Sequence, residues 1–274
     1  MRKLLVPTDF SDQAENALKV AAQFAREHHC EIYLLHILEI PLQEVDPLNS
    51  YNDLPEAMFF MKLAHNRFEK LLEKPYLKGL TIHETVDFHE IFKGIFHVCQ
   101  KNEIDLIIMG SNGSSGLTEM LIGSNTEKVV RTSEIPVLVI KKEHEAFTVK
   151  DFVFASDFKN ESIPSYKKAI EFAKKLNAKI HLLMVNTPNK FITTESSKRR
   201  MKIFEEASDF SNYTTNIFND VNIEKGIMNF AQSIDAQLIG MSTHGRQGIS
   251  HFFNGSISED LVNHAKRPVI TFKI

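Results

Sequence analysis

The segment that decides the fold is Gly110-Ser-Asn-Gly113-Ser-Ser-Gly-Leu-Thr-Glu-Met-Leu-Ile-Gly123-Ser124. The apolar run 106–109, which is typical of a buried strand, comes before it, and a helical spacing of apolar residues follows from Asn125. A glycine loop between a strand and a helix start exposes backbone N–H groups that, with the helix dipole, attract phosphate. The segment therefore predicts an anion-binding loop in an α/β protein.

The same arrangement returns later in the chain, as Ser242-Thr-His-Gly245-Arg-Gln-Gly-Ile-Ser-His-Phe-Phe-Asn-Gly255-Ser256. The two loops are offset by 132 positions (245 − 113), whereas the pairs that follow the two first strands, Asp9-Phe10 and Asp157-Phe158, are offset by 148 (157 − 9). The first copy is thus longer by about 16 residues, within the region 41–75. The repeat indicates a duplicated domain.

The repeat predicts two tandem domains, 1–141 and 150–274, joined by a linker over 142–149. Each copy begins with a strand, a helix and a second strand, an order that favours parallel βαβ units. We expect an α/β fold of two doubly wound domains, each with a five-stranded parallel sheet and helices on both faces. The expected first-copy strands are 3–8, 31–38, 80–86, 106–109 and 136–140, and the expected helices follow Ser11 or Asp12 or cover 56–74 and 90–100.

Composition narrows the class of protein. An apolar content of 43% and a charged content of 24% are those of a globular protein with an adequate core. A net charge of −3 gives no reason to expect a nucleic-acid partner. The chain reaches Asp9 before a signal-peptide core could form, and no apolar run approaches membrane-spanning length. With Cys30 and Cys99 as the only cysteines, we expect a cytoplasmic protein without membrane contact.

The pattern G-x2-G-x9-G-[ST], behind a strand and ahead of a helix and a Pro-Val strand, resembles the nucleotide-binding signature of the universal stress protein family. Two copies indicate a tandem member, although Ser242 replaces the opening glycine of the second. The resemblance implies the strand order 3-2-1-4-5, which would bring Asp9 beside the loop at the topological switch point. It also implies that strands 136–140 and 268–272 pair into an intramolecular pseudo-dimer, and it leaves a homodimer of two chains open.

The resemblance implies that the ligand is an adenine nucleotide, ATP or else ADP or AMP, with any Mg²⁺ carried in by the nucleotide. The candidate binding residues are Pro7, Thr8, Asp9, Ile37, Met109, Gly110, Gly113, Gly123, Ser124 and Asn125 in the first copy, and Ser156, Asp157, Val185, Ser242, Gly245, Arg246, Gly255 and Ser256 in the second. Several of them have a plain structural alternative. A strand-end aspartate can cap the next helix, a serine at a helix start can act as an N-cap, and an apolar strand residue can belong to the core.

Ser242 suggests that the two copies differ. If the backbone here needs a positive φ or touches the ligand, serine adds strain and places a Cβ in the ligand's path. Arg246 acts in the opposite direction, because it can add a cation near the phosphates. We therefore expect two nucleotide sites of unequal affinity, with the stronger in the first domain.

Catalytic and metal-binding patterns are weak in this sequence. We find no nucleophile elbow and no P-loop, so we assign no catalytic residue and expect at most slow ATP hydrolysis. The densest cluster among the twelve histidines, His28-His29-Cys30, lacks zinc-site spacing, and we expect no dedicated metal site. The leading interpretation is a stress-response regulator with an unidentified protein partner. The alternatives are a nucleotide-free interaction scaffold with vestigial loops and an enzyme of adenylate chemistry.

Overall fold

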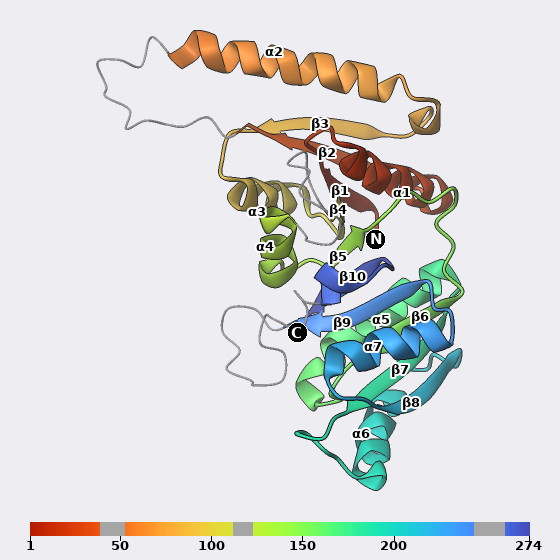
Figure 1. Ribbon diagram of the computed structural model, residues 1–274. Helices are drawn as coiled ribbons and strands as arrows, with labels where there is room; N and C mark the ends of the chain where they lie inside the picture. The colour runs from red at the N-terminus through yellow and green to blue at the C-terminus, as the bar shows by residue number, and fades with distance from the viewer. Residues whose placement is uncertain (39–52, 112–122, 244–260) are drawn as a thin grey trace.

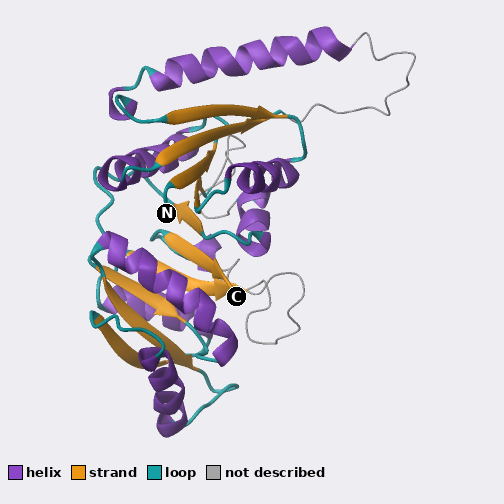
Figure 2. Ribbon diagram, turned by 180° about the vertical axis from the view of Figure 1, so that it is seen from behind, coloured by secondary structure: helices purple, strands orange, loops and turns teal. Residues whose placement is uncertain are grey.

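The computed structural model describes residues 1–38, 53–111, 123–243 and 261–274. Ten strands form one sheet in the order β3-β2-β1-β4-β5-β10-β9-β6-β7-β8, which runs through the middle of the molecule (Figures 1 and 2). Strands are parallel within the first half (β1–β5) and within the second half (β6–β10), and β5 and β10 pair antiparallel where the halves meet. Each half thus has the order 3-2-1-4-5, and the expected fold class is confirmed.

The elements of the first half agree with the sequence pattern to within a few residues. They are β1 (Lys3–Pro7), α1 (Asp12–His28), β2 (Glu31–Ile37), α2 (Asp53–Leu72), a 3-10 turn (Pro75–Leu77), β3 (Ile82–Asp87), α3 (Ile91–Asn102), β4 (Leu106–Gly110), α4 (Ser124–Thr132) and β5 (Val137–Ile140). α1 shows why the pattern succeeds. Its N-cap is Ser11, whose Oγ accepts from the N–H of Ala14 at 3.3 Å, and its alanine-rich face is buried against the sheet.

The second half repeats this order. Its elements are β6 (Asp151–Ala155), a 3-10 turn (Asn160–Ser162), α5 (Ile163–Leu176), β7 (Lys179–Asn186), α6 (Thr194–Glu206), β8 (Tyr213–Asn219), α7 (Ile223–Ser233), β9 (Leu238–Thr243) and β10 (Val269–Lys273). No helix in the described part of the chain is long and apolar enough to cross a membrane.

Each face of the sheet carries an apolar core that extends across both halves. Helices α1, α2, α5 and α6 contribute to one core, and α3, α4 and α7 contribute to the other. At the β5–β10 junction, Leu138 pairs with Ile270 on the first face, and Val139 pairs with Val269 on the second. The predicted pairing of the fifth strands is thereby confirmed, and the halves share their cores.

The segment between the halves contains a buried aromatic anchor. Phe147 is 5% exposed, its ring centroid lies 5.9 Å from that of Phe24 on α1, and its N–H donates to Gln23 Oε1 at 2.7 Å. Phe24 in turn stacks on Phe172 of α5 at 5.8 Å. The expected linker therefore includes a residue packed on α1, and α1 in turn contacts α5 of the second half.

The apolar residues of 56–74, among them Phe59, Leu63 and Phe68, predict an amphipathic helix with a covered apolar face, and α2 departs from this expectation. Phe68 and Leu71 are buried, but Phe59 is 63% exposed and Leu63 is 38% exposed. α2 lies along the β3 edge of the sheet (Figure 1), and its last turns supply the described residues that pack into the core. The spacing of apolar residues correctly predicted a helix but overestimated how much of it is covered.

Candidate functional site

The carboxyl ends of β1 and β4, adjacent in the sheet, border a hollow of about 360 Å³, here called the β1–β4 hollow. Nine of the ten first-copy candidates line it: Pro7, Thr8, Asp9, Ile37, Met109, Gly110, Gly123, Ser124 and Asn125. The tenth, Gly113, lies outside the described residues. The volume is within the range of small-molecule sites, which occur at such switch points in open α/β sheets.

A tight turn after β1 forms one wall of the hollow. Thr8 Oγ1 accepts from the N–H of Phe10 at 3.0 Å, and Asp9 Oδ1 accepts from the N–H of Ser11 at 3.0 Å. Phe10 has a φ of 64°, a strained value for a non-glycine residue. Asp9 is only partly buried and lines the hollow, and its carboxylate holds the turn but does not cap α1, whose N-cap is Ser11.

The start of α4 forms the opposite wall. The N-cap of α4 is Gly123, which has no side-chain capping bond, and Ser124 is the first helical residue. The expectation that Ser124 is the N-cap is therefore wrong by one position. The N–H of Gly123 donates to the carbonyl of Ser111 at 2.9 Å, and Thr126 Oγ1 donates to the carbonyl of Gly110 at 3.0 Å. These bonds fix the start of α4 beside the end of β4, with its first N–H groups uncapped by a side chain.

Gly110 is required for a reason that the loop pattern does not reveal. A Cβ at this position would lie 2.6 Å from the carbonyl oxygen of Gln13 at the start of α1, and Gly110 does not have a positive φ. The glycine therefore allows α1 to approach the end of β4 closely.

The remaining lining is mostly apolar. Ile91 and Ile95 on α3 join Ile37 and Met109, which gives the hollow an apolar side next to its polar walls. Sequence reasoning missed both α3 residues, because helix periodicity assigns them to the core.

His36 is a further lining residue that the pattern did not single out. Its Nδ1 lies 2.8 Å from the carbonyl oxygen of Thr8, and its ring centroid lies 4.7 Å from that of Phe10. Burial lowers the pKa of His36, and the bond to Thr8 opposes this effect only in part. A neutral imidazole at the end of β2 is thus favoured.

A second, cationic depression adjoins the hollow and shares Thr8 and Asp9 with it. Arg67 and Lys70 on α2 line it, as do Lys74, just after α2, and Glu15 on α1. Lys74 is paired with Glu15, and the Arg67 guanidinium lies 5.5 Å from the Phe10 ring centroid. Three cations against two carboxylates give this side of the site a positive balance that suits an anionic ligand.

In the second half, a hollow of about 30 Å³ lies at the carboxyl ends of β6 and β7, next to α7. Ser156, Asp157 and Val185 line it, as do Lys190 and Ile192. The amide side chain of Asn186 bonds both the N–H of Ile192, at 2.8 Å, and its carbonyl, at 3.1 Å, which folds this segment back over the end of β7. The turn after β6 repeats that after β1, with a Phe158 φ of 53°.

The expected backbone strain at Ser242 is absent. Its side chain is fully buried, and its Oγ lies 2.6 Å from Ser165 Oγ on α5. Ser242 also lacks a positive φ. The serine therefore does not strain the backbone at this position. The other loop candidates, Gly245, Arg246, Gly255 and Ser256, lie outside the described residues.

Asp157 is 8% exposed, and Lys159 Nζ lies 3.2 Å from its Oδ2. The second-half carboxylate is thus already paired with a cation of its own chain.

These features define a doubly wound α/β protein with a ligand-sized hollow at the switch point of its first half. The model of the Universal stress protein family matches residues 1–141 and 148–273, and the chain belongs to this family.

Individual relatives agree. Universal stress protein MJ0577 of Methanocaldococcus jannaschii is 33% identical over 156 residues, covering 52% of this chain and 96% of the relative. A universal stress protein of Synechocystis sp. is 23% identical over 297 residues and matches 100% of both chains. The crystal structure of a universal stress protein from Archaeoglobus fulgidus superposes with a TM-score of 0.68 at 20% identity, covering 99% of this chain and 98% of that one, which shows a shared fold.

Proposed function

We propose that the first half of this chain binds ATP, or another adenine nucleotide, in the β1–β4 hollow, and that binding serves a stress-response regulator rather than a fast enzyme. The proposal depends on one observation: a single hollow of about 360 Å³ is lined both by apolar side chains and by the start of α4. The apolar side, with Ile91 and Ile95, suits a flat base, and the N–H groups at the start of α4 suit phosphate.

The charges around the hollow support the same placement of the nucleotide, with its phosphates at the start of α4. Asp9, at the end of β1, can accept hydrogen bonds from ribose hydroxyls, and the α4 start carries partial positive charge. Arg67 and Lys70 add positive charge on the neighbouring depression. Any Mg²⁺ would arrive with the nucleotide. We expect at most slow hydrolysis, because the sequence has no nucleophile elbow and no P-loop.

We further propose that the second half binds nucleotide weakly, since its hollow is about 30 Å³ and Asp157 is paired with Lys159. In this view the second half acts mainly as the strand partner of the first. We therefore expect one strongly bound nucleotide for each chain.

The test is Asn125→Asp, a nearly isosteric change at the second residue of α4. A carboxylate near a helix N-terminus stabilises the helix by about 0.3–1 kcal/mol, whereas it repels a phosphate placed there. Repulsion of about 1–4 kcal/mol at 4 Å corresponds to a loss of about fivefold to several hundredfold in affinity. Isothermal titration calorimetry should therefore show weaker binding of ATP and AMP, unchanged binding of adenosine and no loss of thermal stability.

Asn222→Asp is the matched control. Asn222 is the N-cap of α7, where its side chain accepts from the N–H of Lys225 at 2.8 Å, and it does not line either hollow. This variant should bind ATP as the parent does. If the parent binds no adenine nucleotide, the proposed function fails. If Asn125→Asp binds ATP with parental affinity, the phosphate does not lie at the α4 start.

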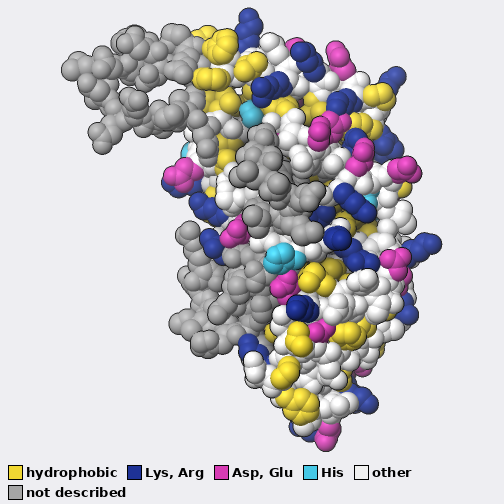
Figure 3. Space-filling model, in the orientation of Figure 1, with side chains coloured by type: hydrophobic (Ala, Val, Ile, Leu, Met, Phe, Trp, Pro, Cys, Tyr) yellow, Lys and Arg dark blue, Asp and Glu magenta, His cyan; other side chains and the backbone are white. Residues whose placement is uncertain are grey.

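A second candidate function, an interaction scaffold that needs no nucleotide, is favoured by the exposed apolar side chains of α2. Met58 is 67% exposed and Phe59 is 63% exposed, and hydrophobic side chains gather at this end of the molecule (Figure 3). Sedimentation velocity of nucleotide-free parent and of a Met58→Ser/Phe59→Ser variant tests this candidate. Self-association that the double substitution abolishes would support it, and a parent that stays monomeric at all concentrations would argue against a second chain as the partner.

A further inference from the structure

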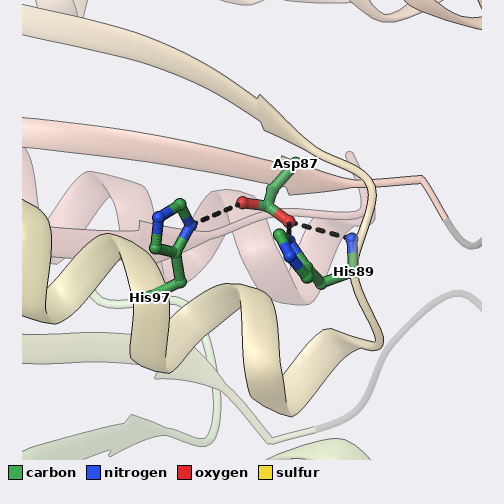
Figure 4. A group of neighbouring side chains, drawn as sticks. All are labelled: Asp87, His89 and His97. Atoms are coloured by element: carbon green, nitrogen blue, oxygen red, sulfur yellow. Dashed lines mark hydrogen bonds and ion pairs between the residues drawn. The ribbon is translucent and has the colours of Figure 1, made fainter.

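A cluster of metal-ligating side chains lies outside the β1–β4 hollow. Asp87, His89 and His97 each offer one ligand atom, and these atoms all lie within 4.8 Å of one another. Among the described residues, His28, His29 and Cys30, the densest cluster in the sequence, do not form such a group. Figure 4 shows the Asp87 carboxylate between the two imidazole rings.

Three separate segments bring the cluster together. Asp87 is the last residue of β3, His89 lies in the turn that follows, and His97 lies in the second turn of α3. His89 Nδ1 is in direct contact with Asp87 Oδ1, and His97 Nδ1 lies 3.3 Å from Asp87 Oδ2. Both imidazoles therefore direct the same kind of atom at one carboxylate, and their ring centroids are 5.4 Å apart.

The carboxylate is held firmly while the histidines remain accessible. Asp87 is 7% exposed, and its Oδ1 also accepts from the N–H of His89 at 2.9 Å. A Cβ on Gly94 of α3 would lie 3.1 Å from Asp87 Oδ1, so the glycine lets the helix pack directly against the carboxylate. The His89 and His97 side chains are 56% and 53% exposed, which leaves an open side for solvent.

We propose that Asp87, His89 and His97 bind a divalent transition-metal ion, with Zn²⁺ as the best fit. Two imidazoles and one carboxylate are ligands that Zn²⁺ accepts, and a site with three protein ligands keeps a further position for water. On binding, each Nδ1 gives its hydrogen-bonding role to the metal, so the ring carries its proton on Nε2, and Asp87 contributes an oxygen. The ion would join the end of β3 to α3.

The alternative is a carboxylate that simply accepts hydrogen bonds from two histidines. Such a pair needs no metal, and its energetic contribution is small at these exposures. The two interpretations differ in whether the cluster takes up metal at one ion per chain, because isolated surface histidines bind metal weakly and without fixed stoichiometry.

The experiment uses the full chain freed of metal with a chelator and titrated with ZnCl₂ by calorimetry, and with CoCl₂ by visible absorption. We expect one ion for each chain, Co²⁺ bands of a low-symmetry site and a higher thermal midpoint with Zn²⁺. Loss of a ligand in His89→Ala or His97→Ala should weaken binding by more than the roughly 10–100-fold that follows loss of a second-shell partner. Asp87→Asn, which keeps the shape and one acceptor oxygen, should also bind more weakly.

His83→Ala is the matched control, because His83 also lies on β3 but is paired with Glu31, at 2.8 Å, and not with Asp87. It should bind Zn²⁺ as the parent does. The proposal is overturned if the parent takes up no stoichiometric Zn²⁺, or if a His89→Ala/His97→Ala variant keeps the parental affinity and Co²⁺ spectrum. Neither outcome bears on nucleotide binding, which depends on other residues.

Discussion

The close approach of α1 to Gly110 predicts that Gly110→Ala destabilises the first half. The added Cβ would lie 2.6 Å from the Gln13 carbonyl oxygen and 2.7 Å from its carbonyl carbon, and both are backbone atoms that can move only if the start of α1 moves. Overpacking of this kind costs about 1–3 kcal/mol, whereas replacing glycine by alanine returns about 0.4–1 kcal/mol through the unfolded chain. The overpacking cost is the larger effect, and the midpoints of the two ranges give a net loss of about 1.3 kcal/mol in the free energy of unfolding.

The assay is thermal unfolding followed by circular dichroism, with guanidinium unfolding as a second probe. At about 2–4 °C for each kcal/mol, the midpoint of the first half should fall by about 3–5 °C. ATP affinity should fall as well, since Gly110 lines the β1–β4 hollow.

Ser242→Ala is the contrasting variant at the equivalent position. It keeps the Cβ that the second half already accommodates and removes only the bond to Ser165, which costs about 1 kcal/mol. It should leave nucleotide binding unchanged. A Gly110→Ala protein with the parental midpoint and affinity would refute the reasoning, because it would show that the start of α1 adjusts freely.

Three further predictions follow from buried groups. Burial lowers the pKa of Lys141, whose Nζ donates to the carbonyl of Val262, to about 8. The unfolded chain keeps that proton up to about pH 10.4, so the stability of the parent relative to Lys141→Met should rise between about pH 8 and 10.4. Guanidinium midpoints measure this difference, and a difference between the two proteins that does not change with pH would contradict the prediction. Burial raises the pKa of Cys99 to about 12 and also raises that of Cys30, so iodoacetamide should modify both thiols in denaturant but neither in the native protein, as read by mass spectrometry. Phe147→Ala should lower the free energy of unfolding by about 3–5 kcal/mol, because the ring packs against α1. A loss below about 0.5 kcal/mol would mean that the linker does not contribute to stability.

The strands and the duplication could be predicted because each depends on local or repeated signals. The apolar runs before the two loops mark β4 and β9, and the matched Pro-Val pairs mark the ends of the halves. The resemblance then supplied the sheet order and the β5–β10 pairing. These features need no knowledge of which side chains touch.

The details that failed depend on contacts between distant segments. The need for glycine at 110 comes from Gln13, and the tolerance of serine at 242 comes from Ser165, neither of which any spacing within the loop can reveal. His36, Ile91 and Ile95 reach the hollow from other elements, and Asp87 meets His97 because a helix turns back on a strand end. The spacing of residues along the chain does not show which distant side chains come into contact.

The antiparallel junction of β5 with β10 has a consequence for how the two halves can differ. Two separate copies that associate through identical strands must carry the same residue on both sides and come apart on dilution. Here a covalent tether supplies the partner at a fixed effective concentration, whatever the amount of protein in solution. One half can therefore lose its own cavity and still complete the sheet of its neighbour, so duplication separates the task of holding the molecule together from the task of receiving a ligand.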